Sequence, residues 1–490
     1  MRLSTTLAWA VYQLASAIST QDCATFARNA VLSNPEATLL NSSYPTETPI
    51  YWDFQLSLPD ARIYNSLFLA IGNGGMAGKY DTPANEFMWN INKGYAIAGC
   101  DSGHEASEIN NFGAGGPGLF IDYLQHTEQV EAWIHNSIAM HTPTSREVVE
   151  SFYGVQPEYS YFKGCSTGGA QEFALALLWP DLFDGIIAGC PANCKGAGFL
   201  PQPTLDFITS AVLDKCDLLD GVADRVLENP LVCDFDINTL ACEPSATDLS
   251  SCLTPAQITT VEAIYAGPKY PNGTQIYPGF PVSSEIEWMR QETDLVQLFT
   301  SSILQNLVFK DLKYDILRFN WDSDVDRVDR EAGILIDEIG VDFSRFKAAG
   351  GKMLVFQGWA DQYIGATWPI QHLHQIEDSH GGSVSDFFNL FMIPGSGHCL
   401  ASSKDPNVPG AYHILETLVD WVENGVPPEE VMTDQPLNGE KVSRKLCPWP
   451  QTARYVKGDV NDWTSYVCGG GEMTASLEKG SIVCGSNYKS

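Results

Sequence analysis

Basic residues are scarce in this chain of 490 residues: 28 Lys and Arg stand against 60 Asp and Glu, which gives a formal net charge of −32. A body of that charge repels phosphate backbones and anionic lipids, so nucleic-acid binding is disfavoured as a function. Charged residues amount to 18% and hydrophobic residues to 44%, which excludes intrinsic disorder. No fixed-period repeat and no low-complexity tract occurs.

Long apolar runs are also missing, and no stretch approaches the roughly eighteen apolar residues that cross a bilayer. The first twenty residues resemble a secretion signal, with Arg2, a mostly apolar run at Leu7–Leu14 and a small-x-small site at Ala15–Ala17. In an exported chain, the 13 cysteines predict mostly disulfides rather than metal ligands. Asn41 and Asn272 begin N-glycosylation motifs.

Short apolar runs alternate with helix-like stretches along much of the chain. The runs have the size of buried parallel strands, and they are Leu67–Ile71, Tyr95–Gly99, Tyr159–Phe162, Gly185–Ala188, Met353–Phe356 and Phe388–Ile393. The helix-like stretches are Glu128–Tyr153, Gly169–Leu178, Thr367–Ile376 and Ala411–Asn424. This alternation predicts an α/β fold with a parallel sheet.

The alternation stops near Pro191 and resumes near Gly351. Since the chain is too long for one ordinary core, we expect residues 192–345 to form an inserted domain. Residues 21–191 and 346–490 would then form the main domain. Within it, Pro427–Ser490 contains Pro, Gly and three cysteines and is expected to wrap over the surface as a tail.

The most specific motif is G-x-S-x-G at residues 164–168, directly after a predicted strand. In strand–turn–helix context, the serine of this motif is a nucleophile on a strained turn. Chance is the alternative, because Gly-rich chains often contain the pattern. The strand before the motif favours Ser166 as a nucleophile.

A nucleophilic serine needs a base to take its proton and an acid to orient that base. Asp361 and His398 each follow a predicted strand, in the chain order Ser, Asp, His that this motif requires. Carboxyl ends of parallel strands meet at one edge of a sheet, where ligands bind. His104 is the rival base; because it precedes the serine, we expect it to be structural or to line the pocket.

Cysteines adjoin both ends of this predicted triad: Cys165 precedes Ser166, and Cys399 follows His398. If serine and histidine are in hydrogen-bond reach, the two cysteines are close enough to form a disulfide. By loop entropy, closing so long a loop contributes about 5 kcal/mol of stability. Accidental adjacency is the alternative.

The oxyanion of an acyl-transfer intermediate needs backbone donors. Thr167, directly after the nucleophile, is expected to supply one N–H. Gly74 or Gly75, in the loop after Leu67–Ile71, is expected to supply the other. The choice between the two glycines stays open, and so does a tight turn without catalytic duty.

Residues 217–226 of the expected insertion form an acidic loop between Cys216 and Cys233, which are placed to staple it. Three carboxylates around a glycine suit a hard cation, although the spacing is not that of an EF-hand. A solvated acidic turn is the alternative. The expected ligands of a structural Ca²⁺ are the side chains of Asp217, Asp220 and Asp224 and carbonyls such as those of Val222 and Val226.

From about Gln21 to Cys468, the chain resembles the tannase and feruloyl esterase family of secreted ester hydrolases. The resemblance rests on an ordered set of short segments. These are residues 72–75, 94–96, 101–104, 164–169, 217–226, 358–361 and 397–399.

The resemblance implies an α/β-hydrolase core with a large inserted lid domain that binds calcium and covers the active site. It implies the triad Ser166, Asp361 and His398, braced by a Cys165–Cys399 disulfide. The further disulfides that it implies are Cys216–Cys233, Cys242–Cys252 and Cys447–Cys468. The cysteines whose pairing stays open are Cys23, Cys100, Cys190, Cys194 and Cys484.

Together these features predict a secreted serine esterase that cleaves esters of aromatic or phenolic acids through an acyl-enzyme. The expected substrate is a small molecule or a phenolic ester linked to polysaccharide, with no nucleic-acid or membrane partner. The chain is expected to be a monomer or a homodimer. The alternatives are a tannase acting on gallate esters, a serine peptidase, and a catalytically silent secreted binding protein on the same scaffold.

Overall fold

The computed structural model describes residues 54–79, 84–107, 110–189, 200–244, 251–289, 298–399, 402, 404–405 and 408–470. The predicted signal at residues 1–20, the acceptor Asn41 and four cysteines without an expected partner lie outside these ranges. Those cysteines are Cys23, Cys190, Cys194 and Cys484.

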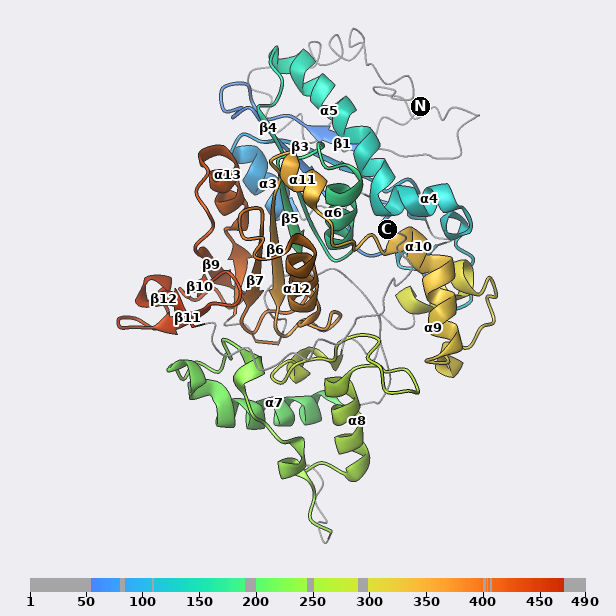
Figure 1. The fold of residues 1–490 in the computed structure, drawn as a ribbon, viewed down its shortest axis with the longest axis vertical. Helices are drawn as coiled ribbons and strands as arrows, with labels where there is room; N and C mark the ends of the chain where they lie inside the picture. The colour runs from blue at the N-terminus through green and yellow to red at the C-terminus, as the bar shows by residue number, and fades with distance from the viewer. Residues whose placement is uncertain are drawn as a thin grey trace.

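A seven-stranded sheet runs through the centre of the molecule in the order β1-β3-β2-β4-β5-β6-β7 (Figure 1). All neighbours pair in parallel except β1, which lies antiparallel to β3 at the edge. The strands are β1 (Phe54–Ser57), β2 (Leu67–Ile71), β3 (Ala96–Cys100), β4 (Tyr159–Cys165), β5 (Gly185–Gly189), β6 (Lys352–Gly358) and β7 (Phe388–Ile393). The six predicted strands are therefore confirmed, and β1 is an addition.

Alternate residues of each strand pack on opposite faces of the sheet, as the two-residue period of a strand requires. Phe68 and Ala70 of β2 pack in one core with α5 (Ser137–Tyr153), α6 (Thr167–Leu178) and α12 (Trp368–His380). Leu67, Leu69 and Ile71 pack in the other core with α3 (Ala84–Asn92) and α13 (Ile414–Asn424). The sheet is therefore covered by helices on both faces.

The helix predicted at Glu128–Tyr153 consists of three consecutive pieces. These are α4 (Thr127–Glu131), a π-helical turn at Ala132–Asn136, and α5. A glycine with a left-handed backbone, Gly154, ends α5, as is common at helix C-termini. None of the helices in the described ranges is long and apolar enough to cross a membrane.

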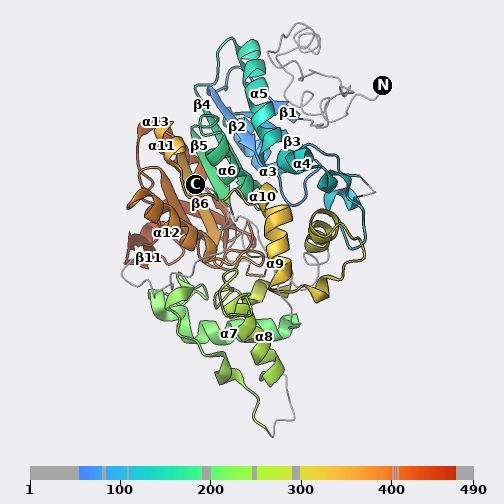
Figure 2. The ribbon, with the colours of Figure 1, turned by 45° about the vertical axis from the view of Figure 1, so that its right-hand side comes forward.

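Between β5 and β6 the chain leaves the sheet, and the described part of this excursion packs as two bodies. Residues 200–289 have a core of their own around α7 (Gln202–Cys216) and α8 (Pro255–Ala266), below the sheet in Figure 1. Residues 298–336 instead pack beside α4, as both views show (Figure 2). Their helices are a π-helix at Ile303–Val308, α9 (Ser323–Val328), a π-helical turn at Asp329–Gly333 and α10 (Ile334–Ile336).

The second body shares its core with the main domain. Leu304 and Leu307 lie in one apolar cluster with Ile121 and Trp133. The short helix α11 (Ser344–Ala348) then leads back to β6. Part of the segment expected to be a separate insertion is therefore built onto the flank of the sheet domain.

The C-terminal region expected as a surface tail, Pro427–Ser490, forms two small sheets together with one strand that precedes it. Val431 and Leu446 of the first sheet are buried in the core that lies between α13 and the central sheet. The strands are β8 (Pro409–Tyr412), β9 (Val431–Pro436) and β10 (Arg444–Leu446) in the first sheet, and β11 (Thr452–Tyr455) and β12 (Tyr466–Gly469) in the second.

Candidate active site

Ser166 stands at the sharp turn between β4 and α6. Its backbone has φ 63° and ψ −119°, and positive φ is uncommon for a residue with a side chain. The turn closes tightly because of the motif's glycines: a Cβ on Gly164 would lie 2.8 Å from the backbone of Gly168. The Ser166 N–H donates to the Gly189 carbonyl over 2.8 Å, which fixes the turn to β5.

A buried glutamic acid lies directly behind this turn. Glu172 of α6 is fully buried and accepts a hydrogen bond from the Gly164 N–H through Oε1, whereas Oε2 has no partner among the described residues. Burial raises the pKa of this carboxyl well above its usual range, more than the hydrogen bond from Gly164 lowers it. Glu172 therefore supports the turn through this hydrogen bond, and its burial favours the neutral form of the carboxyl.

Asp361 and His398 meet at the carboxyl ends of β6 and β7. The imidazole Nδ1 lies 2.9 Å from Oδ2 and 3.1 Å from Oδ1 of the carboxylate. Asp361 is fully buried, whereas 11% of the His398 side chain is exposed. With Nδ1–H donating to the carboxylate, Nε2 is left free to accept a proton.

Three further donors hold the Asp361 carboxylate: the N–H groups of Tyr363 and Ile364, at 2.8 and 3.0 Å, and Nε2 of Gln357 at 3.0 Å. Burial pushes the pKa of Asp361 up, but the charge of His398 and these hydrogen bonds outweigh that effect. The net pKa lies below its ordinary value. Asp361 is therefore ionised although it is buried.

A disulfide between Cys165 and Cys399 joins the serine turn to the histidine loop, with 5.9 Å between the two Cα atoms across 234 positions of sequence. Ser166 and His398 are each the immediate neighbour of a bridged cysteine. The structure also contains Cys216–Cys233, Cys242–Cys252 and Cys447–Cys468. These are the four pairings that the resemblance implied, and Cys100 is a buried free thiol.

The glycine-rich loop after β2 is fastened to the first turn of α6. The hydroxyl of Thr167 donates to the Gly75 carbonyl over 2.9 Å, and the Trp133 indole N–H donates to the same oxygen over 3.2 Å. No described residue accepts a hydrogen bond from the backbone N–H of Thr167, Gly74 or Gly75. These three groups are therefore available as donors, and the choice between the two glycines stays open.

His104 supports this loop from behind. Its Nε2 lies 2.6 Å from the Met76 carbonyl, and its ring stacks on Tyr123 at 3.7 Å between centroids. Burial lowers the pKa of His104 to about 4 despite the hydrogen bonds to backbone carbonyls. It is a neutral, structural histidine in this position, which agrees with the role expected for it.

A family model described as "Tannase and feruloyl esterase" matches residues 41–195 and 192–469. The chain belongs to the tannase and feruloyl esterase family. It is 29% identical over 444 residues to a probable feruloyl esterase B-1 of Aspergillus oryzae, covering 83% of this chain and 79% of the relative. It is 28% identical over 483 residues to an uncharacterized esterase of Xanthomonas campestris pv. campestris, covering 85% and 81%.

Two solved structures show that the fold is that of an α/β-hydrolase. Feruloyl esterase B from Aspergillus oryzae superposes with a TM-score of 0.75 at 24% identity, covering 87% of this chain and 88% of that one. The tannin acyl hydrolase of Aspergillus niger gives 0.72 at 21% identity, covering 87% and 85%. Family membership makes the chain a carboxylic ester hydrolase.

The acidic loop of this family member is held by an arginine. Arg444 of β10 forms an ion pair with Asp224, and Cys216–Cys233 closes the chain around the loop. Burial raises the pKa of Asp220 to about 6, and the charges of Asp224 and Asp217 add to this rise. Within the described ranges, no three His, Cys, Asp or Glu side chains are arranged to hold a metal ion.

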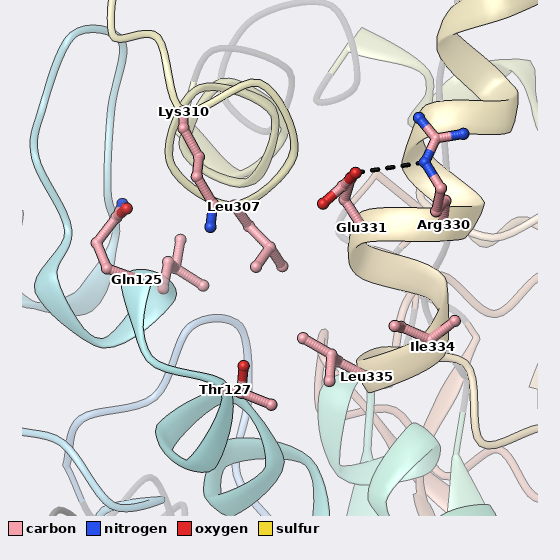
Figure 3. Close-up of a pocket in the computed structure, with 9 residues that line it drawn as sticks. Gln125, Thr127, Leu307, Lys310, Arg330, Glu331, Ile334 and Leu335 are labelled. Atoms are coloured by element: carbon pink, nitrogen blue, oxygen red, sulfur yellow. Dashed lines mark hydrogen bonds and ion pairs between the residues drawn. The ribbon is translucent and has the colours of Figure 1, made fainter.

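One pocket of about 200 Å³ lies away from the catalytic edge, between the segment 124–127 and the helices at 303–308 and 329–336. Figure 3 shows the side chains of Lys310 and Glu331 directed toward the space between these segments, with Glu331 also paired to Arg330. None of its lining residues belongs to the loops that carry Ser166, Asp361 or His398. The pocket therefore shares no lining residue with the loops of the candidate triad.

Three buried side chains near the site were missed by sequence reasoning. Gln357 binds the Asp361 carboxylate, Gln362 Oε1 accepts from the His398 N–H over 3.0 Å, and Glu287 contacts the loop after His398. Gln362 directly follows the predicted acid Asp361, and this adjacency in the sequence could have identified it. No sequence signal connects Glu287 with residues more than a hundred positions away.

Proposed function

We propose that the chain is a secreted serine esterase that hydrolyses esters of aromatic or phenolic acids through an acyl-enzyme. Ser166 is the nucleophile, His398 the base and Asp361 the acid that orients it. The observation that carries the proposal is the His398–Asp361 hydrogen bond, joined to the strained Ser166 turn by the Cys165–Cys399 disulfide.

In the acylation step, Ser166 Oγ attacks the ester carbonyl carbon while His398 Nε2 takes the hydroxyl proton. Asp361 keeps the proton on Nδ1 and stabilises the imidazolium that forms. The tetrahedral intermediate then collapses, the bond from carbon to the alcohol oxygen breaks, and His398 donates its proton to the leaving alcohol.

In the deacylation step, water attacks the acyl-serine as His398 takes its proton, and Ser166 leaves with that proton returned to Oγ. Both intermediates carry an oxyanion, which the Thr167 N–H and an N–H of Gly74 or Gly75 would stabilise. Losing one such donor typically costs about 3 kcal/mol of transition-state stabilisation.

The aromatic acyl group is proposed because named relatives are feruloyl esterases. The fold similarity to a tannin acyl hydrolase keeps gallate esters as the second candidate. Measuring kcat/KM on methyl ferulate, methyl caffeate, methyl gallate, simple aryl acetates and matched amides separates these classes. Highest turnover of the amides would instead assign a peptidase.

The nucleophile is tested with Ser166→Ala, measured beside wild type on a chromogenic aryl ester and with a fluorophosphonate probe. We expect turnover to fall by about 10⁶-fold, labelling to disappear, and the circular dichroism spectrum to stay unchanged. Retained turnover in this variant would refute the assignment. A wild-type chain that neither turns over esters nor reacts with the probe would be the silent binding protein.

We also propose a structural Ca²⁺ in the acidic loop, held by the carboxylates and carbonyls given above. In support, Asp217 Oδ1 is buried and has no hydrogen-bond partner among the described residues, and carboxylate and carbonyl oxygens are the donors that Ca²⁺ prefers. When bound, the ion would neutralise acidic groups that repel each other. EGTA should lower the melting temperature and added Ca²⁺ should restore it, whereas Asp217→Asn should remove this response.

Export to an oxidising compartment is part of the same proposal. The residues 1–20 have the pattern of a secretion signal, and four disulfides suit an extracellular protein. Asn272 is exposed and fits a glycosylation acceptor. Mass spectrometry of the secreted chain tests both the cleavage site and the glycan, and light scattering separates monomer from homodimer.

A further inference from the structure

Two buried carboxylates lie in one short 3₁₀ helix of the insertion, at Glu285–Glu287. Both side chains are almost completely buried, at 0% and 1% exposure. Burying a carboxylate costs free energy unless hydrogen bonds compensate for the lost water. Each of the two must therefore be held by specific donors, and those donors differ.

The donors to Glu285 all come from the insertion itself. They are the hydroxyls of Tyr265 and Thr209 and the N–H of Ser283. Tyr265 also packs against Trp288 in the core of the insertion. Glu285 therefore ties the insertion together internally, and none of these three donors belongs to the loops that carry the candidate triad.

Glu287 faces the other way, toward the loop that follows the catalytic histidine. Its Oε1 accepts a hydrogen bond from the Ser402 hydroxyl over 2.5 Å and from the Lys404 N–H over 3.2 Å. Ser402 Oγ in turn accepts from the N–H groups of Lys404 and Asp405. The carboxylate therefore fixes the chain four to seven residues after His398.

The same carboxylate also reaches the residue just before the histidine. A Cβ built on Gly397 would lie 3.7 Å from Cδ of Glu287 and 3.2 Å from Oε1 of Gln362. That Gln362 oxygen accepts the His398 N–H. The backbone on both sides of His398 is therefore enclosed by Gln362 from the loop after β6 and by Glu287 from the insertion.

We propose that Glu287 is a positioning residue, through which the insertion keeps the imidazole of His398 aligned with the hydroxyl of Ser166. The proposal rests on the triad assigned under the proposed function. It gives the insertion a part in the chemical step, in addition to any role in covering the site. The Cys165–Cys399 disulfide restrains the loop directly after His398, and the Glu287 carboxylate restrains the following residues, 402–405.

The test measures the rate constant for phosphonylation of Ser166 by a fluorophosphonate, because that step needs a positioned base and no aromatic acyl group. The variants are Glu287→Ala, Ser402→Ala, the double variant, and Glu287→Gln, which keeps an acceptor oxygen. Glu285→Ala is the matched control, and Tyr265→Phe replaces it if that variant does not fold. The kcat and KM for methyl ferulate and the melting temperature are recorded for each.

We expect Glu287→Ala to slow labelling and lower kcat by about tenfold or more, since displacing a reacting group by 1 Å costs up to about 10²-fold. KM should change by less than about twofold. Glu287→Gln should recover most of the rate, and the double variant should be no slower than Glu287→Ala. Glu285→Ala should lower the melting temperature but be labelled at the wild-type rate.

Three outcomes would overturn the proposal: labelling of Glu287→Ala at the wild-type rate, equal slowing by Glu285→Ala, or single effects that multiply in the double variant. If Glu287→Ala does not fold, Ser402→Ala alone decides. A wild type that is labelled but hydrolyses no aromatic ester refutes the substrate class and leaves this test valid. A wild type that is not labelled refutes both proposals.

Discussion

Removing the disulfide next to the proposed catalytic residues Ser166 and His398 should separate its effect on stability from its effect on activity. In the double variant Cys165→Ala/Cys399→Ala, Ser166 and His398 keep their own side chains and lose only the covalent link between their neighbours. The link closes a loop across 234 positions, whereas Cys242–Cys252 in the insertion spans 10. This difference in length sets the expected magnitudes.

By loop entropy, the long closure contributes about 5 kcal/mol to the free energy of unfolding, and the short one about 3 kcal/mol. Both variants should therefore be less stable than wild type, the one without Cys165–Cys399 by about 2 kcal/mol more. The effect on catalysis should differ sharply. A histidine loop held by noncovalent contacts alone should misplace the base, which lowers kcat by about 10²-fold.

The assay compares wild type with Cys165→Ala/Cys399→Ala and the matched control Cys242→Ser/Cys252→Ser. Urea denaturation gives the loss of stability, and hydrolysis of an aryl ester well below each denaturation midpoint gives kcat. The control should lose stability and keep its kcat. If the Cys165→Ala/Cys399→Ala variant kept the wild-type kcat, or the control lost as much, the disulfide would not position the catalytic pair.

Asp361→Asn should lower kcat by about 10⁴-fold with KM little changed, because an amide does not hold the imidazole tautomer with Nδ1 protonated. Steady-state kinetics measure this effect, and a loss of kcat below tenfold would contradict the assigned role. Gly168→Ala should lower kcat by about tenfold with little change in melting temperature, since its Cβ would lie 3.1 Å from the Asn73 carbonyl oxygen and displace the glycine-rich loop after β2, which is proposed to stabilise the oxyanion. An unchanged kcat would show that the loop adjusts without loss of activity. Glu172→Gln should gain stability relative to wild type as pH rises. Burial raises the folded-state pKa of Glu172 above its value of about 4.5 in the unfolded chain. Below pH 4.5 Glu172 is protonated in both states. Above pH 4.5 the unfolded chain loses this proton more easily than the folded chain, so the free energy of unfolding of wild type falls by up to about 1.4 kcal/mol per pH unit. Urea midpoints at pH 4.5, 6 and 7 measure this difference, and a difference independent of pH would show that the carboxyl is not neutral in the fold.

The parallel strands could be predicted because each is a short, continuous apolar run buried on both sides. β1 was not predicted because it is a four-residue edge strand with three half-buried residues, and it pairs antiparallel to β3. The placement of residues 298–336 beside α4 could not be predicted either. Leu304 and Leu307 would suit any apolar face, and the sequence does not say that Trp133 supplies it.

At the candidate site, the motif and chain order pointed to Ser166, Asp361 and His398, and their cysteine neighbours pointed to the disulfide. These signals are local, or they depend on the rule that parallel strands end at one edge. The partners that hold the site in place gave no such signal. Glu287 resembles any other acidic residue until the fold buries it against the loop that follows His398.

The backbone at Ser166 has a consequence for anyone improving this enzyme by heat selection. A side chain in that conformation costs about 1–3 kcal/mol, and glycine escapes the penalty. Screening for thermal stability alone would therefore favour Ser166→Gly, a more stable chain that lacks the proposed nucleophile. Every round of such a campaign should score catalysis together with heat tolerance.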